Sequence, residues 1–368
     1  MKKSYLYGGV AVVALAAIIG VSQMNAHKAP TAQSKAALTA AIVTDVGGID
    51  DKSFNQSAWD GLKSWGKDNK LSQGKNGFDY FQSKSAADYK TNFQSAIAAN
   101  YSVVAGVGYS LHNATVETAK ANPTKKFVFI DDVDTAKTKN VVSLMFRSEQ
   151  SSYLAGVAAA TKAKDLGEKS VGFIGGIHGN IIDAFEAGYT AGVKSVDPDM
   201  KVNVQYADSF TDSAKGQLIA NAMIANGNKV IFQAAGAVGN GVFSAAKAHN
   251  TALDANSKDK VWVIGVDMDQ SDMGSYTSKD NKKANFTLTS SITGVGNGLK
   301  LTLKSVQDKK FKGGTIVAYG LKENGVSTPT KNMTADEKAA VEKAKKAIID
   351  GKVKVPNHPA HSQFNQEF

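Results

Sequence analysis

Residues 40–59, AAIVTDVGGIDDKSFNQSAW, predict a buried strand, a glycine-bearing turn and then a helix. Asp45 follows the apolar strand, and Phe54 and Asn55 stand where the helix begins. In an open parallel sheet, small ligands bind in the crevice outside the carboxyl ends of the strands. The turn therefore places these three side chains in one candidate pocket, although an ordinary strand-to-helix turn with polar surface residues has the same pattern.

The composition is that of a globular protein long enough for two domains. Of its 368 residues, 42% are hydrophobic and 21% are charged. The chain has no cysteine, so disulfides, thiolate catalysis, cysteine metal sites and lipid attachment through cysteine are all impossible. The formal net charge of +10 fits nucleic-acid binding, attraction to an anionic cell envelope or a solvated lysine-rich helix face. No basic motif with interleaved aromatics is present, and no nucleic-acid partner is expected.

The N-terminus is typical of an export signal. Lys2 and Lys3 precede an uncharged apolar stretch at residues 5–21, and a small, polar segment follows. The apolar stretch is near the lower limit for spanning a bilayer, so an uncleaved membrane anchor is the alternative. In both cases we expect an exported protein, either held at the outer face of the cytoplasmic membrane or secreted. Residues 1–37 are set aside as a signal or anchor segment with its linker.

Strand and helix patterns alternate along the rest of the chain. Strands are expected at residues 40–45, 77–82, 102–107, 126–131, 140–146, 170–175, 201–206, 229–234 and 260–267. Helices are expected at residues 53–67, 87–100, 111–121, 150–164, 181–196, 212–226 and 239–249, with Ser53 and Gln56 at capping-box spacing in the first. Apolar strands alternating with helices predict parallel sheets covered on both faces, in two similar α/β lobes.

Acidic residues stand where three predicted strands end, at Asp45, Asp131 and Asp267. A further strand ends in a glycine-rich turn around Gly236, where the backbone can approach a ligand closely. Ionised carboxylates only accept hydrogen bonds, so several of them on one site suit a ligand rich in hydroxyl or N–H donors, such as a sugar or a nucleoside. Phe54 and Phe232 offer flat apolar faces for a ring. Each acid, taken alone, also fits a structural cap or turn.

Enzyme and metal motifs are weak. The sequence has no G-x-S-x-G elbow and no P-loop, so neither catalysis nor a cofactor is expected. Asp267, Asp269 and Ser271 resemble the start of a calcium loop, but the glycine is misplaced and Ser278 stands where the bidentate glutamate belongs. No metal site is therefore expected.

Ordered motifs along the chain resemble one known family. They are VTDVGGIDDKSFNQ (43–56), VGFIGG (171–176), FEAG (185–188), IFQAAG (231–236), GNG (239–241), IGVDMDQS (264–271), YGL (319–321) and GKVKVP (351–356). Together they cover residues 38–356 and are very similar to the basic membrane protein family. These are substrate-binding proteins of ABC importers, and the purine nucleoside receptor A proteins belong among them.

The resemblance implies a two-lobed periplasmic-binding-protein fold of type I, which closes on a ligand in the interlobe cleft by a hinge. The expected lobe I comprises residues 38–147 and about 285–309, and the expected lobe II comprises residues 148–284 and about 310–356. Residues 357–368 form the C-terminal tail. The implied function is capture of a nucleoside outside the cell, without catalysis, and its delivery to an ABC permease in the membrane. A monomer is expected.

The resemblance also implies roles for the base-binding residues. In the family the base lies between aromatic rings, which carries over to Phe54 and, less directly, to Phe232. Asn55 and Asp131 match positions that bind the base by hydrogen bonds. Whether the base is a purine, as the family suggests, or a pyrimidine stays open.

For the sugar, Asp267 matches a ribose-binding acid, and Asp45 and the Gly236 turn lie beside it at the cleft. Tyr109 and His112 follow the strand that ends at residue 107 and are further candidates for the cleft, with a surface position favoured for His112.

Two departures from the family pattern matter. Val21 follows Ile18-Ile19-Gly20 where a lipobox cysteine is usual, and Thr293 follows the strand at 288–292 where a lysine is usual. Threonine is shorter than lysine and neutral, so the affinity or the ligand itself could differ. A ligand sensor or surface-associated binding protein that is not coupled to transport is therefore the alternative function. An enzyme acting on nucleosides is a further alternative, but no activated nucleophile supports it.

Overall fold

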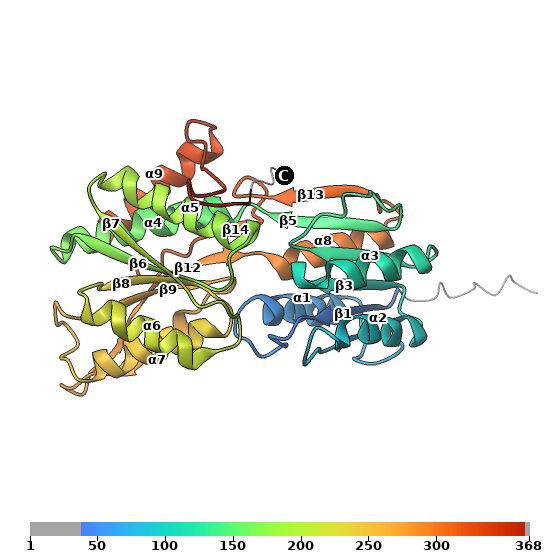
Figure 1. Cartoon of the computed structure of the whole chain (residues 1–368), viewed down its shortest axis with the longest axis horizontal. Helices are drawn as coiled ribbons and strands as arrows, with labels where there is room; N and C mark the ends of the chain where they lie inside the picture. The colour runs from blue at the N-terminus through green and yellow to red at the C-terminus, as the bar shows by residue number, and fades with distance from the viewer. Residues whose placement is uncertain (1–37, 365–368) are drawn as a thin grey trace, which may run out of the picture. The chain divides into compact units, whose positions relative to one another are not determined.

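The computed structural model describes residues 38–364, so the predicted export segment lies outside the described part. Figure 1 shows two sheets, each with helices on both faces. We call the first sheet with its helices lobe I and the second sheet with its helices lobe II. The predicted α/β class with two lobes is confirmed. Between residues 38 and 364, no helix combines the length and apolar character that a membrane crossing requires.

Lobe I is built on a six-stranded sheet in which every neighbouring pair is parallel. The strand order is β13 (Thr315–Tyr319), β5 (Val141–Phe146), β4 (Lys126–Ile130), β3 (Val103–Val107), β1 (Ala40–Thr44) and β2 (Phe78–Phe81). One face is covered by α1 (Phe54–Asp68) and α8 (Val295–Gln307), and the other by α2 (Asp88–Ala98) and α3 (His112–Ala121). A 3₁₀ turn, Tyr109–Leu111, joins β3 to α3.

Lobe II repeats this plan. The strand order is β14 (Val326–Ser327), β12 (Thr287–Thr293), β9 (Trp262–Val266), β8 (Val230–Ala234), β6 (Ser170–Gly175) and β7 (Lys201–Tyr206). Its helices are α4 (Ser148–Asp165), α5 (Asn180–Val196) and α9 (Ala335–Ile349) on one side, and α6 (Ser213–Ala225) and α7 (Val238–Thr251) on the other. The edge strand β14 runs antiparallel to β12, and a short antiparallel hairpin of β10 (Ser275–Thr277) and β11 (Lys283–Asn285) follows β9.

Each strand and helix expected before residue 267 is present, with ends that differ by no more than a few residues. The pattern is confirmed because the central strands are apolar on both faces, as parallel sheets between helices require. All five residues of β1, β3 and β8 are buried. After residue 267, the strand at β12 was expected, whereas α8, α9, β13 and β14 were not.

The late segments cross between the lobes. β12 belongs to the lobe II sheet, but α8, which follows it directly, packs on α1 in lobe I. β13 then returns to the edge of the lobe I sheet, and β14 and α9 lie in lobe II. Each of these segments therefore contributes to both lobes, whereas the expected boundaries assigned each segment to one lobe. The lobe limits as residue numbers stay a prediction.

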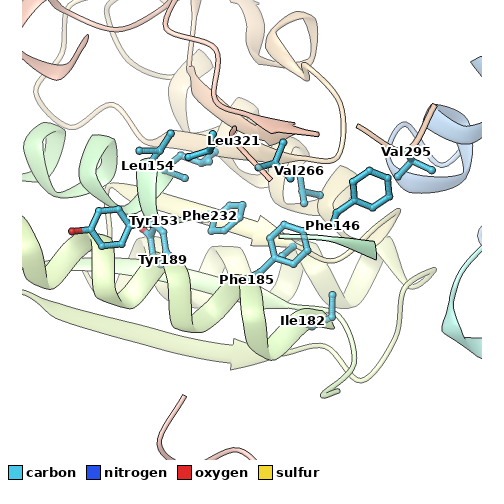
Figure 2. Close-up of a cluster of buried hydrophobic side chains, with 14 of the residues drawn as sticks. Phe146, Tyr153, Leu154, Ile182, Phe185, Tyr189, Phe232, Val266, Val295 and Leu321 are labelled. Carbon is cyan, nitrogen blue, oxygen red and sulfur yellow. The ribbon is translucent and has the colours of Figure 1, made fainter. Parts of the chain in front are cut away.

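The hydrophobic core is continuous across these crossings. Figure 2 shows α5 side chains in contact with the lobe II sheet, and the same cluster reaching Phe146 at the end of β5 and Val295 at the start of α8. Because Phe146 and Val295 lie where the chain passes between lobes, the apolar cluster holds the crossing strands in place. The carboxyl ends of both parallel sheets face each other on either side of it.

Candidate functional site

A cavity of about 600 Å³, counting the space that opens to solvent, lies between the carboxyl ends of the two sheets. This volume is within the range of small-molecule sites. Six of the predicted site residues line it, namely Asp45, Phe54, Asn55, Asp131, Gly236 and Asp267. The structure therefore brings together residues that are up to 222 positions apart in the sequence. Their roles in binding stay a prediction.

The start of α1 is capped differently from the expectation. Ser53 and Gln56 do not form a capping box, because the Ser53 side chain makes no cap hydrogen bond. Asp51 replaces it: its Oδ1 accepts from the backbone N–H groups of Ser53 (2.9 Å) and Gln56 (3.0 Å), and its Oδ2 accepts from that of Asn55 (2.9 Å). A carboxylate satisfies several unpaired N–H groups at once, and the positive end of the helix dipole favours it. The Ser53 hydroxyl is therefore free for another partner.

That partner lies in the other lobe. The Ser53 hydroxyl donates to Asp267 Oδ2 at 2.5 Å. Beside it, Gln270 Nε2 donates to the backbone carbonyl of Lys52 at 2.7 Å. These two bonds join the turn before α1 in lobe I to the loop after β9 in lobe II, at one edge of the cavity.

Asn55 leaves a buried acceptor at the cavity. Its Nδ2 donates to Asp45 Oδ1 at 2.8 Å and to Asp51 Oδ2 at 3.0 Å, so both amide hydrogens are engaged. Because the two partners are carboxylates, the amide orientation is fixed, with Oδ1 as the remaining atom. Asn55 Oδ1 is buried and has no partner within residues 38–364. A buried acceptor is usually paired, so this atom calls for an N–H or O–H donor from a ligand.

Asp131 and Asp267 occupy equivalent positions in the two lobes. Asp131 directly follows β4 and Asp267 directly follows β9, and both are 7% exposed. Their φ angles are +61° and +63°, in the left-handed region that residues with a side chain rarely adopt. Such backbone conformations cost about 1–3 kcal/mol and concentrate at functional sites. The two turns thus place a carboxylate at the cavity from each sheet.

The carboxylates of the cavity are difficult to ionise. Burial raises the pKa of Asp131 well above its usual range, and the neighbouring Asp267 carboxylate raises it further. Burial also raises the pKa of Asp267 to about 7, although the Ser53 hydroxyl acts in the opposite direction. The pKa of Asp45 is raised by burial too, against the effect of the Gly47 N–H and the Asn55 amide. No lysine, arginine or histidine is among the described residues that line the cavity.

Aromatic rings line the cavity from both lobes. Phe54 lies in lobe I and Phe210 lies in lobe II, in the loop after β7. Tyr109 lines the cavity as expected, and its ring meets that of Phe210 edge-on with centroids 6.3 Å apart. Phe185 of α5 completes the apolar lining. Phe210 was not predicted, and its only signal in the sequence is its place two residues before the α6 cap, Asp212.

Phe232 is not at the cavity, which corrects the expectation that it stacks on a base. It is fully buried, and its ring lies 5.5 Å from that of Phe173 and 5.2 Å from that of Tyr189. Side chains alternate along a strand, and Phe232 points to the face of β8 that α5 covers. Figure 2 shows Phe232 within this cluster, next to Phe185.

The other candidates are placed as follows. Gly236 has φ +59°, and an added Cβ would lie 3.2 Å from the Phe210 carbonyl, so the turn requires glycine on both counts.

His112 lies at the surface, as favoured, with its Nδ1 2.9 Å from Asp132 Oδ2. Thr293 is buried at the end of β12 and is not among the residues that line the cavity.

Comparisons with known proteins also indicate a protein that binds a small ligand. A family model described as "ABC transporter substrate-binding protein PnrA-like" matches residues 38–358. The chain is 50% identical to the ABC transporter nucleoside-binding protein BmpA of Lactococcus lactis subsp. cremoris, over 97% of this chain and 100% of that protein. It is 30% identical to basic membrane protein A of Borreliella burgdorferi, over 88% of this chain and 89% of that protein.

The fold has solved counterparts. A structure of an ABC transporter system solute-binding protein from Aeropyrum pernix K1 matches with a TM-score of 0.73 at 22% identity, over 88% of this chain and 95% of that one. This confirms the predicted type I fold. The family model, the Lactococcus relative and this neighbour are described as substrate-, nucleoside- and solute-binding proteins of ABC transporters, and none of them as an enzyme. The resemblance found in the motifs is thereby confirmed, and the chain belongs to the PnrA-like family of ABC transporter substrate-binding proteins.

Proposed function

We propose that the protein binds a nucleoside, in particular a purine nucleoside, in this cavity as the extracytoplasmic binding subunit of an ABC importer. The observation that carries the proposal is the donor–acceptor balance of the cavity. Its polar side chains offer the carboxylates of Asp45, Asp131 and Asp267 and the unpaired Asn55 Oδ1, which are acceptors, beside aromatic rings. A nucleoside has a flat ring with N–H groups and a sugar with hydroxyl donors. The relative that is 50% identical is named a nucleoside-binding protein.

The proposed pose follows from the two sides of the cavity. The base lies between Phe54 of lobe I and Phe210 of lobe II, and its N–H groups donate to Asn55 Oδ1 and Asp131. The sugar hydroxyls donate to Asp45 and Asp267, where the backbone of the Gly236 turn is close. Charge-assisted hydrogen bonds of this kind contribute about 1.5–3 kcal/mol each.

The charge of the site favours an uncharged ligand. Carboxylates are concentrated at the cavity, and its described lining has no cationic side chain. A phosphate group buried there would have no counter-ion, and each acid that ionises would repel it, which costs free energy. We therefore propose that nucleosides bind and that nucleoside monophosphates do not.

Closure and delivery are part of the proposal. The bonds from Ser53 to Asp267 and from Gln270 to Lys52 support a state in which the lobes approach each other around the ligand. Strands that cross between lobes are suited to bend as hinges. The closed, loaded monomer would then dock on a membrane permease at the outer face of the cytoplasmic membrane. The predicted export segment would either anchor it there or be removed on secretion.

A thermal-shift screen of the chain from residue 38 onward tests the ligand. The panel contains purine and pyrimidine nucleosides, free bases, simple sugars and nucleoside monophosphates. A ligand at a hundred times its dissociation constant stabilises the folded state by about 2.7 kcal/mol, which raises the melting temperature measurably. A shift with nucleosides alone supports the proposal, and the order of purines and pyrimidines identifies the base. A cooperative melt without a shift for any nucleoside contradicts it.

A sensor or surface-associated binding protein of the same fold is the second candidate, because the chain has no cysteine for the usual lipid anchor. Uptake of a radiolabelled nucleoside by cells with and without the gene separates the two. Reduced uptake in the deletion strain supports the importer, and unchanged uptake supports the second candidate.

A further inference from the structure

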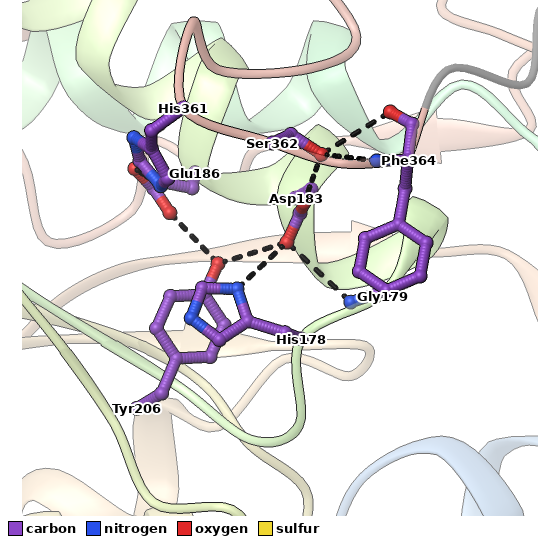
Figure 3. Close-up of polar contacts among 8 residues, drawn as sticks. All are labelled: His178, Gly179, Asp183, Glu186, Tyr206, His361, Ser362 and Phe364. Carbon is purple, nitrogen blue, oxygen red and sulfur yellow. Dashed lines mark hydrogen bonds and ion pairs between the residues drawn. The ribbon is translucent and has the colours of Figure 1, made fainter.

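The C-terminal segment 357–364 lies against the first turns of α5, outside the ligand cavity. Figure 3 shows the Ser362 hydroxyl donating to the Asp183 carboxylate and His361 beside Glu186, with the His361 Nε2 3.5 Å from Glu186 Oε1. Phe364 lines a second cavity together with Ile181 of α5 and Phe146 of the lobe crossing. The segment therefore contacts α5 through polar and apolar side chains.

The two carboxylates that it contacts are buried. Asp183 is 1% exposed and Glu186 is 3% exposed, and they lie one helical turn apart on α5. No lysine or arginine of the described chain forms an ion pair with either of them. Burial raises the pKa of Glu186, against the effect of the Tyr206 hydroxyl and of His361. Buried carboxylates need hydrogen-bond donors to offset the loss of water.

Those donors come from two places. The fixed donors belong to lobe II: the Tyr206 hydroxyl donates to Asp183 at 3.2 Å and to Glu186 at 2.7 Å, and His178 Nδ1 lies 3.2 Å from Asp183. His178 is also stacked on Tyr206, with ring centroids 3.4 Å apart. The C-terminal segment adds the Ser362 hydroxyl, which donates to Asp183, and His361, whose Nε2 lies 3.5 Å from Glu186 Oε1 as an ion-pair contact. Within residues 38–364, no set of three such acidic and histidine side chains is arranged to hold a metal ion.

The same turns of α5 also form a wall of the ligand cavity. Ile181, Ile182 and Phe185 line that cavity, and they alternate along the helix with Asp183 and Glu186. A shift or fraying of these turns would displace both sets of side chains together. The helix start itself has no side-chain cap, since Gly179 is the N-cap residue. Besides the Gly179 N–H, which donates to Asp183 Oδ1 at 3.4 Å, contacts from outside the helix hold the first turns of α5.

We propose that residues 357–364 are a strap that fixes the first two turns of α5, and through Ile182 and Phe185 the lobe II wall of the ligand cavity. Ser362 and His361 are positioning residues: they act on the ligand through α5 and do not touch it. The effect on affinity rests on the proposed nucleoside function, whereas the effect on α5 does not.

The test uses the full chain with Ser362→Ala, His361→Ala and the double variant. Ser362→Thr keeps the hydroxyl donor and serves as a rescue, and Lys354→Ala changes an exposed side chain just before the strap as a matched control. Amide hydrogen exchange of residues 180–187 and calorimetric titration with adenosine and guanosine are measured well below the melting temperature. We expect faster exchange confined to these turns and about tenfold weaker binding in the double variant, with both control variants close to the parent protein.

Each of the following outcomes would contradict the proposed role of the strap. Unchanged exchange at residues 180–187 shows that the segment does not order α5. Faster exchange throughout lobe II shows a general stabilising role instead. Local loosening with unchanged affinity shows that the cavity wall does not depend on the strap. If the parent protein binds no nucleoside, the proposed function fails, and the exchange measurement still decides whether the strap orders α5.

Discussion

Asp131 and Asp267 share the same local structure, one in each lobe. Each ends a buried parallel strand, adopts a left-handed backbone conformation and presents a carboxylate to the cavity. In an ordinary turn at these φ angles, glycine would relieve the strain, and asparagine would avoid the buried charge. An acid there is costly both in backbone strain and in desolvation, so its presence in both lobes supports a role in ligand binding.

Ligand affinity should depend on pH through Asp267. Burial raises its pKa to about 7 in the free protein. Sugar hydroxyls donate to the ionised carboxylate, so a nucleoside binds the ionised fraction, which shrinks as the pH falls through 7. Affinity measured by calorimetry should therefore be about tenfold lower at pH 6 than at pH 8. The raised pKa of Asp131 acts in the same direction.

Asp267→Asn is the control for this prediction. It removes the titrating group and places an amide donor near the hydroxyls, so we expect more than tenfold weaker binding at pH 8 and a flatter pH profile. An affinity that rises as the pH falls, or a variant with the parent profile, would show that Asp267 is not the titrating ligand contact.

Most of the polar site could be predicted, because each residue directly follows a recognisable strand or opens a helix. The aromatic part could not. A strand that is buried on both faces has no polar side to mark its orientation, so the sequence does not show that Phe232 points away from the cavity. Phe210 lies in a loop without periodicity, and only the fold brings it to the same cavity as Phe54. The capping spacing at Ser53 was misleading because Asp51 competes for the same N–H groups.

The start of α1 provides a matched pair of variants. Asp51→Ala removes the cap and should lower the free energy of unfolding by about 1–2 kcal/mol, as measured by urea denaturation. Ser53→Ala leaves the cap intact and removes the bond to Asp267 in the other lobe. It should change stability less than Asp51→Ala does and should weaken nucleoside binding. Equal losses of stability in both variants would contradict this division of roles.

The packing of α1 on α8 depends on two glycines in contact. A Cβ added at Gly61 would lie 2.2 Å from Gly296 Cα, which is backbone and cannot move aside. Gly61→Ala should therefore destabilise the protein by about 1–3 kcal/mol through overpacking, although alanine is the better helix former. Lys67→Ala, on the exposed side of the same helix, should leave the melting temperature close to that of the parent protein. A stabilised Gly61→Ala variant would mean that the helices separate easily.

Elements were predictable where strand and helix alternate regularly, and that regularity ends after residue 267. The later strands are short or lie at sheet edges. The edge strand β13, TIVAY, is as apolar in sequence as β1 or β8 but is partly exposed, so its apolar run does not show where it lies. The lobe to which each late segment belongs depends on contacts made after the chain has crossed over. Local sequence carries no information on that choice.

The two lobes should approach each other when ligand binds. Because the chain has no cysteine, a pair of dyes can be attached to Lys84→Cys in lobe I and Ile177→Cys in lobe II, both exposed positions. Energy transfer between the dyes should increase on addition of the nucleoside identified by the thermal screen. The ligand would stabilise the closed state, in which Ser53 donates to Asp267 and the two lobes lie closer together. The same labels in an Asn55→Ala background should respond only at higher ligand concentration. A constant signal in the parent protein, despite proven binding, would exclude closure.

The return of β13 to the lobe I sheet has a consequence for biosynthesis. The strands β1 to β5 leave the ribosome first, but the neighbour of β5 follows roughly 170 residues later, an interval of about ten to thirty seconds at usual elongation rates. During that time β5 exposes an unpaired edge, and α1 lacks the helix that covers it. A nascent chain of this kind cannot complete its first lobe while it is being made. It therefore stays open to a holding chaperone or a translocation channel until α8 and β13 have been made.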